Sequence, residues 1–258
     1  MSFLNLYIYA SLMVLGLVTA FWLLSVKLKN ASIVDSIWSL GFLVMALYGF
    51  SQVTFYNRNI LLVAIVTIWA LRLSGYITWR NWGEGEDFRY QNFRQKYGPE
   101  RYWWFSFFQV FLLQGALVII IASPLMVTFH RTSSNELNIL DFIAISIWLI
   151  GFIFEAGGDF QMARFKANPD NKGKVMDKGF WKVTRHPNYF GDAAQWWAFG
   201  LFAVASGSYL PLISSLIMTL LLLKVSGVAM LEKTLVNTKP KYHDYIKRTP
   251  AFVPWFSK

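Results

Sequence analysis

Three ionisable residues that could carry chemistry lie in segments that are otherwise apolar. Asp35 opens one such segment, and Arg72 and Tyr76 lie four residues apart, on one helical face, in the next. Ionisable groups at membrane depth cost several kcal/mol, so they are functional candidates by default. We predict Asp35, Arg72 and Tyr76 as catalytic residues that polarise a carbonyl or deliver a proton. The structural alternatives are an interfacial helix N-terminus for Asp35 and a structural pair or snorkelling for Arg72.

A second group of polar residues combines helix carboxylates with a mixed loop. Glu155 and Asp159 lie four residues apart near the end of an apolar segment, and the loop 179–192 holds basic, amide, aromatic and glycine residues. Arg suits phosphate, Asn reads an amide or a ribose, and Tyr or Trp stacks on a base. This pattern predicts a site for an anionic nucleotide cofactor at the cytoplasmic face. Anionic lipid is the alternative ligand, and the lysines of segment 172–178 favour it.

The composition excludes several classes of protein. Of the 258 residues, 55% are hydrophobic and only 15% are charged, and the mean hydropathy is +0.40, which is typical of a membrane protein rather than a soluble one. There is no cysteine, and the three histidines lie far apart in sequence, so no disulfide, thiolate chemistry or metal site is expected. No GxGxxG or P-loop pattern is present, which leaves a Rossmann or Walker site unsupported.

The elements that position these residues are predicted to be seven membrane spans. Each is about 20 mostly apolar residues long, and together they cover Leu4–Val26, Val34–Val53, Ile60–Trp79, Phe105–Phe129, Leu137–Phe160, Tyr189–Ser206 and Tyr209–Leu231. Seven spans place 20 of the 24 Lys and Arg residues on one side and only Arg58 and Arg131 on the other. By the positive-inside rule the N-terminus lies outside and the C-terminus in the cytoplasm. The net charge of +10 is therefore read as topology, and no nucleic-acid partner is expected.

The prediction is thus an all-α integral membrane protein that crosses a bacterial inner membrane several times. Residues 1–258 form one polytopic domain, with substrate-side helices in 1–129 and a cofactor-binding part in 137–258. We expect a monomer or a weak homo-oligomer, in contact with membrane lipids and with a lipophilic small molecule from the bilayer.

The motifs resemble those of a known enzyme family. The run from Gly179 to Gly191, with Arg185-His186-Pro187-Asn188-Tyr189 at its centre and Trp196-Trp197 behind it, resembles the C-terminal domain of the steroid 5-alpha-reductase family. The whole chain is similar to the bacterial branch of that family. Shared features are Asp35-x-x-Trp38, the Gly-Glu-Asp-x-Arg-Tyr of residues 85–90, and the tail pattern from Tyr242 through Tyr245 and Arg248 to Trp255.

The resemblance implies a seven-helix fold that holds NADPH between the cytoplasmic loops and the last helices. Asp159 and Asn188 match family cofactor residues, Asp192 stands where relatives have Glu, and Lys166 stands where relatives place an Arg near the adenosine phosphates. The full set of predicted cofactor-binding residues is Asp159, Arg164, Lys166, Arg185, His186, Asn188, Tyr189, Asp192, Trp196, Glu232, Tyr242, Tyr245 and Arg248.

The substrate side departs from the family pattern. Steroid reductases grip a ketone with a Gln-Glu pair and a Tyr, whereas this chain has Val34-Asp35 at the pair and, if Arg72 matches the family Arg, Trp69 at the Tyr. Tyr76 is the nearest alternative phenol. The substrate is therefore predicted as a steroid-like, isoprenoid or fatty-acyl enone rather than as a particular steroid.

These features predict an NADPH-dependent oxidoreductase that acts on a carbon–carbon double bond. The alternative is an S-adenosylmethionine-dependent methyltransferase of the isoprenylcysteine carboxyl methyltransferase type, which shares a similar Arg-His-Pro-x-Tyr. The seven basic residues of loop 161–188 favour NADPH, because S-adenosylmethionine carries no phosphate. A third possibility is a lipid-binding or scaffold protein without catalysis, which would bind no nucleotide.

Overall fold

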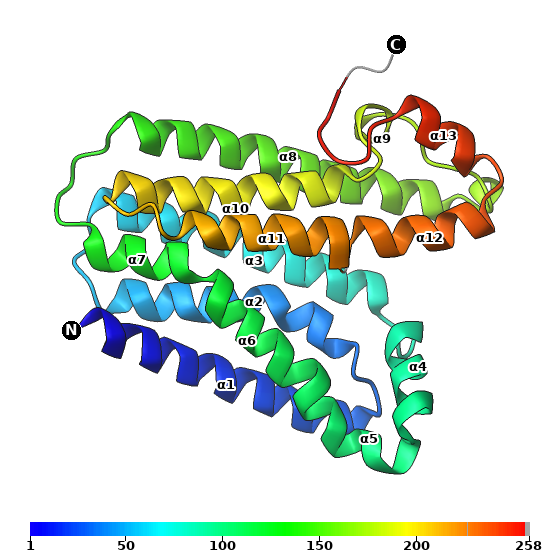
Figure 1. Cartoon of the computed structure of the whole chain (residues 1–258), viewed down its shortest axis with the longest axis horizontal. Helices are drawn as coiled ribbons and strands as arrows, with labels where there is room; N and C mark the ends of the chain where they lie inside the picture. Colours follow the sequence, from blue (N-terminus) through cyan, green and yellow to red (C-terminus); the bar gives the residue numbers. More distant parts are fainter. Residues whose placement is uncertain (226, 256–258) are drawn as a thin grey trace. The chain divides into compact units, whose positions relative to one another are not determined.

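The computed structural model describes residues 1–225 and 227–255, and within these ranges every regular element is a helix (Figure 1). The chain divides into two compact units, Met1–Leu137 and Asn138–Lys258. Six helices are long and apolar enough to cross a membrane by length and composition. The chain is therefore an all-helical, multi-pass membrane protein.

Unit 1 packs three long helices against a fourth, interrupted one. The long helices are α1 (Phe3–Leu28), α2 (Ile33–Ser51) and α3 (Asn57–Asn81). The segment Pro99–Arg131 is the fourth span, and it is divided into α5 (Pro99–Ser106), the π-helix η1 (Phe107–Leu112), α6 (Leu113–Ile121) and α7 (Ser123–Arg131). A short polar helix, α4 (Phe88–Tyr97), joins α3 to this segment outside the spans.

Glycines allow close contacts between helices in the unit 1 core. A β-carbon on Gly41 of α2 would lie 3.1 Å from the side chain of Val118 on α6, and one on Gly115 would lie 3.3 Å from Val18 on α1. Small residues let helix backbones approach closely in a membrane, where apolar side chains gain little from leaving lipid. The contact at Gly41 packs α2, the helix that carries Asp35, against α6.

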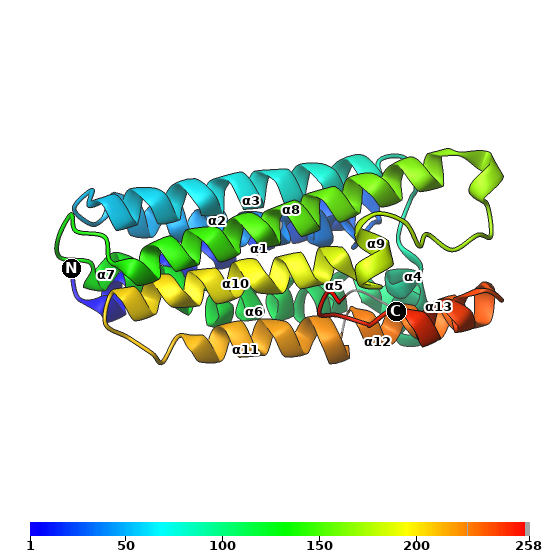
Figure 2. The same cartoon turned by 90° about the horizontal axis from the view of Figure 1, so that it is seen from above.

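Unit 2 is built around two long helices, α8 (Ile139–Ala167) and α10 (Pro187–Ala205), which lie side by side (Figure 2). The remaining span runs through α11 (Leu212–Leu220), the π-helix η3 (Leu221–Val225) and α12 (Val228–Thr238). Short helices complete the unit: the 3-10 helix η2 (Pro169–Asn171), α9 (Phe180–Val183) and α13 (Tyr242–Arg248).

Six of the seven predicted spans match helices that satisfy the length and composition test for crossing a membrane. The exception is α10, which forms where a span is predicted but is not among the six. Its sequence carries Asn188, Asp192 and Gln195, and most of its residues are buried inside the protein. A helix covered by protein needs no lipid-facing apolar surface, which accounts for its lower hydropathy. The seventh span stays a prediction.

Two boundaries differ from the sequence prediction. Helix α8 continues to Ala167, so Arg164 and Lys166 lie on its last turns rather than in the predicted loop. The loop after α3 is not a simple connector, because α4 and α5 occupy most of it. Both differences place charged residues on helices rather than in loops.

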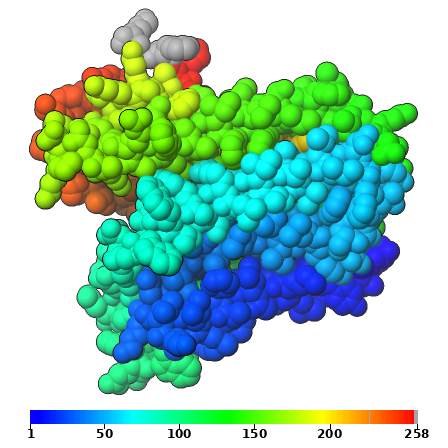
Figure 3. Space-filling view, turned by 180° about the vertical axis from the view of Figure 1, so that it is seen from behind, coloured from blue at the N-terminus to red at the C-terminus, as the bar shows by residue number. Residues whose placement is uncertain are grey.

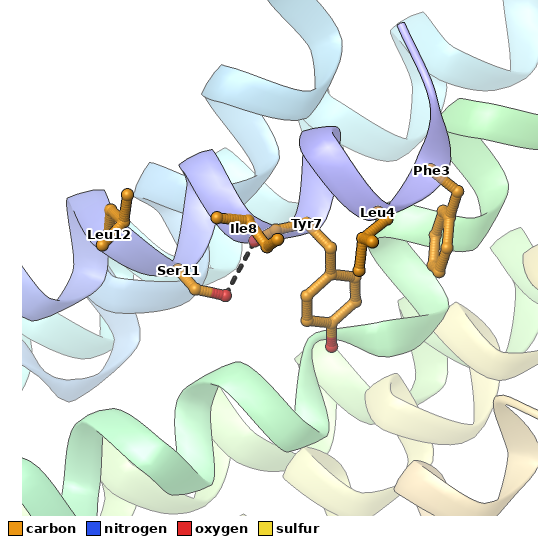
Figure 4. Close-up of a pocket in the computed structure, with 6 residues that line it drawn as sticks. All are labelled: Phe3, Leu4, Tyr7, Ile8, Ser11 and Leu12. Carbon is orange, nitrogen blue, oxygen red and sulfur yellow. Dashed lines mark hydrogen bonds between the residues drawn. The ribbon is translucent and has the colours of Figure 1, made fainter.

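A hollow of about 400 Å³ runs along the first turns of α1, lined by Phe3, Leu4, Tyr7, Ile8, Ser11 and Leu12 (Figure 4). The two hydroxyl groups among its lining residues donate hydrogen bonds to backbone carbonyls: Tyr7 to the carbonyl of Ile119 at 2.5 Å and Ser11 to the carbonyl of Tyr7 at 2.7 Å. The hollow therefore offers apolar surface, which suits an acyl chain, and it contains no residue predicted for catalysis.

Candidate functional site

The loop that precedes α10 is fixed by the end of unit 2. The backbone N–H of Arg185 donates to the carbonyl of Pro250 at 2.9 Å. The hydroxyl of Tyr245 donates to the carbonyl of Trp181, and Tyr245 is 1% exposed. Burial raises the pKa of Tyr245 well above its usual range, so this phenol stays protonated. Tyr245, which the sequence predicts as a cofactor-binding residue, supports the loop through this hydrogen bond.

Arg185 lies at the centre of an ion-pair network. Its Nε and Nη2 atoms lie 2.7 and 3.2 Å from the carboxylate oxygens of Glu232, and His186 Nε2 lies 3.1 Å from the same carboxylate. Arg185 Nη1 donates to the carbonyls of Ile246 and Thr249. The Arg185 side chain is only 9% exposed. Because its donors are used inside the protein, Arg185 orders the loop and does not present an open fork to a phosphate.

Tyrosines and a second arginine surround this network. The ring of Tyr189 stacks on His186, with the centroids 5.5 Å apart and the planes at 12°. Tyr242 is 3% exposed, and burial raises its pKa to about 12. Arg248 forms an ion pair with Asp177, in the loop before α9. The tail pattern from Tyr242 to Arg248 thus holds residues 177–189 in place.

Two amide–carboxylate pairs join α10 to α8. Asn188 Nδ2 donates to Asp159 Oδ1 at 3.1 Å, and Gln195 Nε2 donates to Glu155 Oε2 at 2.7 Å. Glu155, Asp159 and Gln195 are all buried. The structure therefore brings together Asn188 and Asp159, which the sequence placed in one cofactor site.

Other predicted cofactor residues divide between the interior and the surface of unit 2. Asp192 and Trp196 are buried on α10, at 7% and 0% exposure. Arg164 is exposed, and its guanidinium lies 5.7 Å from the ring centroid of Phe160. These positions put Asp192 and Trp196 on the inner side of α10 and Arg164 at the surface of α8.

A cavity of about 300 Å³ opens at the end of α8. It is lined by Phe165, Lys166, Asn168, Pro169, Asn171, Lys172, Gly173 and Lys239. Three of these eight residues are lysines and none is acidic. Burial, and then the positive charge of Lys166, lower the pKa of Lys239 below its usual value. A pocket that gathers three cations without a lining carboxylate is suited to an anion.

In unit 1, Asp35 accepts two side-chain hydrogen bonds from the motif of residues 85–90. Arg89 Nη2 lies 2.7 Å from Asp35 Oδ2, and the Tyr90 hydroxyl donates to Asp35 Oδ1 at 2.7 Å. Tyr90 is 5% exposed, and burial together with the Asp35 carboxylate raises its pKa far above its usual range. Burial alone would raise the pKa of Asp87, but hydrogen bonds from Arg89 outweigh it and lower that pKa.

The same motif docks onto the turn between α1 and α2 (Figure 3, where α4 lies beside the end of α1). Glu86 Oε1 accepts the backbone N–H of Ala31 at 2.8 Å, and Ser32 Oγ accepts the N–H of Asp87 at 3.0 Å. Arg94 then holds Glu86 through two hydrogen bonds of 3.0 and 2.8 Å. Asp35 is therefore part of a charged network that joins α4 to the start of α2.

The side-chain hydrogen-bond partners of Asp35 come from the motif of residues 85–90 rather than from α3. They are Arg89 and Tyr90, whereas the ring of Tyr76 lies near Trp79, with centroids 6.0 Å apart. The motif reaches Asp35 because α4 returns to the start of α2. The catalytic roles of Asp35, Arg72 and Tyr76 stay predictions.

Three residues of these sites, Arg89, Tyr90 and Lys239, are not among the site residues predicted from the sequence. Tyr90 and Arg89 were visible only as parts of a resemblance, and Lys239 only as one of many basic residues. A signal existed for the first two, because an acidic and aromatic loop of that composition is not typical of a linker. For Lys239 there was none, since it lies 73 residues beyond Lys166 in the chain.

Residues 21–249 match the family model described as "Protein of unknown function (DUF1295)". The chain is a membrane protein of the all-helical class, with a basic pocket and a fixed Arg-His-Pro-Asn loop. The chain belongs to the DUF1295 family.

One relative is an uncharacterized protein of Schizosaccharomyces pombe. It is 26% identical over 289 residues, which cover 98% of this chain and 83% of that protein. No solved structure matches the chain. Among residues 1–225 and 227–255, no group of three or more His, Asp or Glu side chains is arranged to hold a metal ion.

Proposed function

We propose that this chain is a membrane-embedded reductase that uses NADPH to reduce a carbon–carbon double bond in a lipophilic substrate. The resemblance to the steroid 5-alpha-reductase family motivates the proposal. The single structural observation that carries it is the lysine-lined cavity at the end of α8.

The cavity fits the part of NADPH that distinguishes it from related cofactors. NADPH carries a phosphate on its adenosine ribose that NADH lacks, and S-adenosylmethionine carries no phosphate at all. Lys166, Lys172 and Lys239 line the cavity, and no acidic residue is among its lining residues, so the lysines would hold a phosphate by charge-assisted hydrogen bonds. Lys239 gains most, because a bound anion offsets both the burial and the repulsion from Lys166 that lower its pKa.

The remaining cofactor contacts would come from the start of α10. Asn188 and Asp159 are paired at 3.1 Å, and Asp159 precedes Lys166 by two turns of α8, about 10 Å along the helix axis. The network of Arg185, Glu232 and His186 keeps this loop rigid. When bound, NADPH supplies the hydride. The residues of unit 2 bind and orient the cofactor.

Unit 1 would bind the substrate and manage the proton. Reduction of a double bond consumes one proton for each hydride, so the protein needs a group that exchanges protons with water. The Asp35 side chain is 22% exposed and lies at the start of α2, which suits that role. Arg89 and Tyr90 keep it oriented.

We also propose a topology and a location for the chain. With α10 as a seventh span, the N-terminus lies outside and the C-terminus lies in the cytoplasm, where the basic cavity meets soluble NADPH. A bacterial inner membrane is proposed from the resemblance to the bacterial branch of the family.

Binding to the protein purified in mild detergent tests the proposal. We expect NADPH to bind more tightly than NADH, and Lys239→Ala to weaken NADPH about 10-fold or more, since a charge-assisted bond contributes about 1.5–3 kcal/mol. NADH affinity should not change. The matched control is Lys247→Ala, because Lys247 is a 79% exposed lysine of the same unit.

Three outcomes contradict the proposal in different ways. Equal affinity for NADPH and NADH would remove the role of the lysine cavity. Tight binding of S-adenosylmethionine, with no binding of NADPH, would favour a methyltransferase. Absence of any nucleotide binding would favour a lipid-binding or scaffold protein.

A further inference from the structure

The hollow on the first turns of α1 is lined by two rows of side chains (Figure 4). Residues within a row are four apart, so they lie on one face of the helix. One row is exposed and the other is half-buried. The exposed row is Leu4, Ile8 and Leu12, and the half-buried row is Phe3, Tyr7 and Ser11. The hollow therefore runs along α1 and is open on the side of the exposed row.

The hollow lies where α1 and the fourth span separate. Further along α1 the two helices touch, because a β-carbon on Gly115 of α6 would lie 3.3 Å from the side chain of Val18. Near the start of α1 a whole aromatic side chain bridges them instead: the ring of Tyr7 points away from α1, and its hydroxyl donates to the carbonyl of Ile119 on α6 at 2.5 Å (Figure 4). The gap between the helices thus widens from Val18 towards Tyr7.

The length of the hollow matches one leaflet of a bilayer. Its lining extends from Phe3 to Leu12, nine residues further along the helix, which is about 14 Å at 1.5 Å per residue. Half of the hydrocarbon core of a bilayer is about 15 Å thick. Because α1 begins at Phe3, the hollow runs from the membrane surface at which this helix starts to about the midplane. An acyl chain of that leaflet covers the same depth.

The chemistry of the hollow changes from its inner part to its surface end. Inside it the hydroxyls of Tyr7 and Ser11 already donate to backbone carbonyls, so a hydrocarbon occupant leaves neither of them without a partner. At the surface end the ring of Phe3 lies 5.4 Å from that of His130. His130 and Arg131 are exposed and form the basic last turn of α7. Basic side chains attract a phosphate group, so this end suits a phospholipid headgroup.

We infer that the hollow binds one acyl chain of a phospholipid from the leaflet in which α1 begins, with the lipid phosphate beside His130 and Arg131. The lipid fills the gap between α1 and the fourth span and stabilises their packing. It is a resident lipid and not a substrate, because Leu12 lies 16 residues, about 24 Å, before the other end of α1 at Leu28, where the network of Asp35 begins. The inference goes beyond the proposed reductase and does not rest on it.

The first test counts the phosphatidylglycerol molecules that the full chain retains after a delipidating detergent wash, by native mass spectrometry. We expect one per chain. Ser11→Phe places a ring in the hollow and should weaken this binding about 10-fold, the effect of losing roughly ten carbon–carbon contacts. The Ser11 hydroxyl bonds only within its own helix, so its loss spares the fold. Met13→Phe is the matched control, because Met13 is 47% exposed on α1 but does not line the hollow.

The second test uses the native chain, so it does not depend on how Ser11→Phe folds. Phosphatidylglycerol with a photoreactive diazirine in the middle of one acyl chain is cross-linked to the protein after the same wash. We expect the label on residues 3–12. A label spread evenly over the exposed residues of α1, such as Leu23 and Leu24, would show ordinary boundary lipid and would overturn the inference. Equal retention of lipid by the native chain and Ser11→Phe would do the same.

A third comparison tests the phosphate and the alternative occupant. Diacylglycerol with the same acyl chains should be retained less than phosphatidylglycerol, and Arg131→Gln should reduce that difference. Equal retention of the two lipids by the native chain would overturn the assignment to a phospholipid. A native chain that washes free of lipid and forms dimers, which Ser11→Phe disrupts, would assign the hollow to a second copy and overturn the inference. These measurements contain no NADPH, so their outcome is separate from that of the proposed reductase.

Discussion

Gly191 of α10 passes so close to Gly151 of α8 that a methyl group on Gly191 would lie 2.3 Å from the Gly151 carbonyl oxygen. The backbone N–H of Glu155 would be only 2.5 Å away. This near-contact of two backbones brings α10 within hydrogen-bonding distance of α8, where Asn188 meets Asp159 and Gln195 meets Glu155. A β-carbon on Gly151 would likewise lie 2.6 Å from the Gly191 carbonyl oxygen, so the polar pairs of unit 2 depend on the absence of a side chain at both positions.

The first prediction follows from that contact. Gly191→Ala should destabilise the protein by about 3 kcal/mol, the upper end of the range for overpacking, because the obstacles are backbone atoms that cannot move aside. Thermal unfolding in detergent measures the change. The control is Gly75→Ala, since nothing lies within 4 Å of its β-carbon position, and a helical Gly-to-Ala change there should be neutral or stabilising. Equal behaviour of the two variants would show that α8 and α10 are not so closely packed.

The second prediction concerns Glu232, the partner of Arg185 and His186. Glu232→Gln should destabilise the protein by about 2–3 kcal/mol, because it leaves the nearly buried Arg185 guanidinium without a counter-charge. Hydrogen exchange at the amide of Arg185, which donates to Pro250, should speed up as the tail loosens. Asp244→Asn is the control, since Asp244 is 78% exposed and such pairs contribute little. If exchange at Arg185 did not change, Glu232 would not be what holds the loop.

The third prediction concerns topology. A reporter fused after Lys258 should report a cytoplasmic location, and one inserted near Ser133 should report the opposite side, because the charge asymmetry of the loops orients the spans. An insertion after Gly207, which follows α10, should also report the outer side if α10 crosses the membrane. A cytoplasmic signal at Gly207 would leave six spans and would require a different charge arrangement.

Much of the fold could be predicted because lipid imposes a simple rule. A helix that faces lipid must be apolar over about 20 residues, so the spans of α1, α2, α3 and α8 are legible in the sequence. The rule weakens for α10, whose neighbours are protein rather than lipid and whose sequence therefore carries Asn188, Asp192 and Gln195. Its helix could be predicted, but its membrane crossing could not be read from hydropathy alone.

The partners of each polar residue were harder to predict. The sequence predicts that Asp35 meets Arg72 and Tyr76 because they lie near the same end of adjacent spans, but it does not predict that the hydroxyl of Tyr90 donates to Asp35. Spacing along one helix places residues on a face, but it does not say that a loop helix such as α4 will fold back onto that face. Likewise, Arg185 looked like a phosphate ligand because Arg often is, whereas Glu232 already binds it.

The last prediction uses the lowered pKa of Lys239. Burial and the charge of Lys166 lower that pKa from its usual 10.5, so in the absence of a ligand the amine of Lys239 loses its proton at a lower pH than the amine of an ordinary lysine. A bound phosphate needs the protonated amine. NADPH affinity should therefore fall as pH rises through the lowered pKa, below the range in which an ordinary lysine titrates. The ribose phosphate does not contribute to this change, because its second ionisation, at a pKa near 6, is already complete.

Two variants separate the cause of this pH dependence. Lys239→Arg should bind NADPH with an affinity that stays level over the same range, because a guanidinium remains charged. Lys239→Met should abolish the preference for NADPH over NADH. The ligand-free protein should keep roughly its stability, because the variant removes a repelled charge but also the hydrogen bond of 2.6 Å that Lys239 Nζ donates to the carbonyl of Lys174. Affinity is measured by NADPH fluorescence, and stability by thermal unfolding without ligand. A Lys239→Met protein that loses stability and keeps its NADPH preference would place Lys239 in the structure of the loop and the phosphate elsewhere.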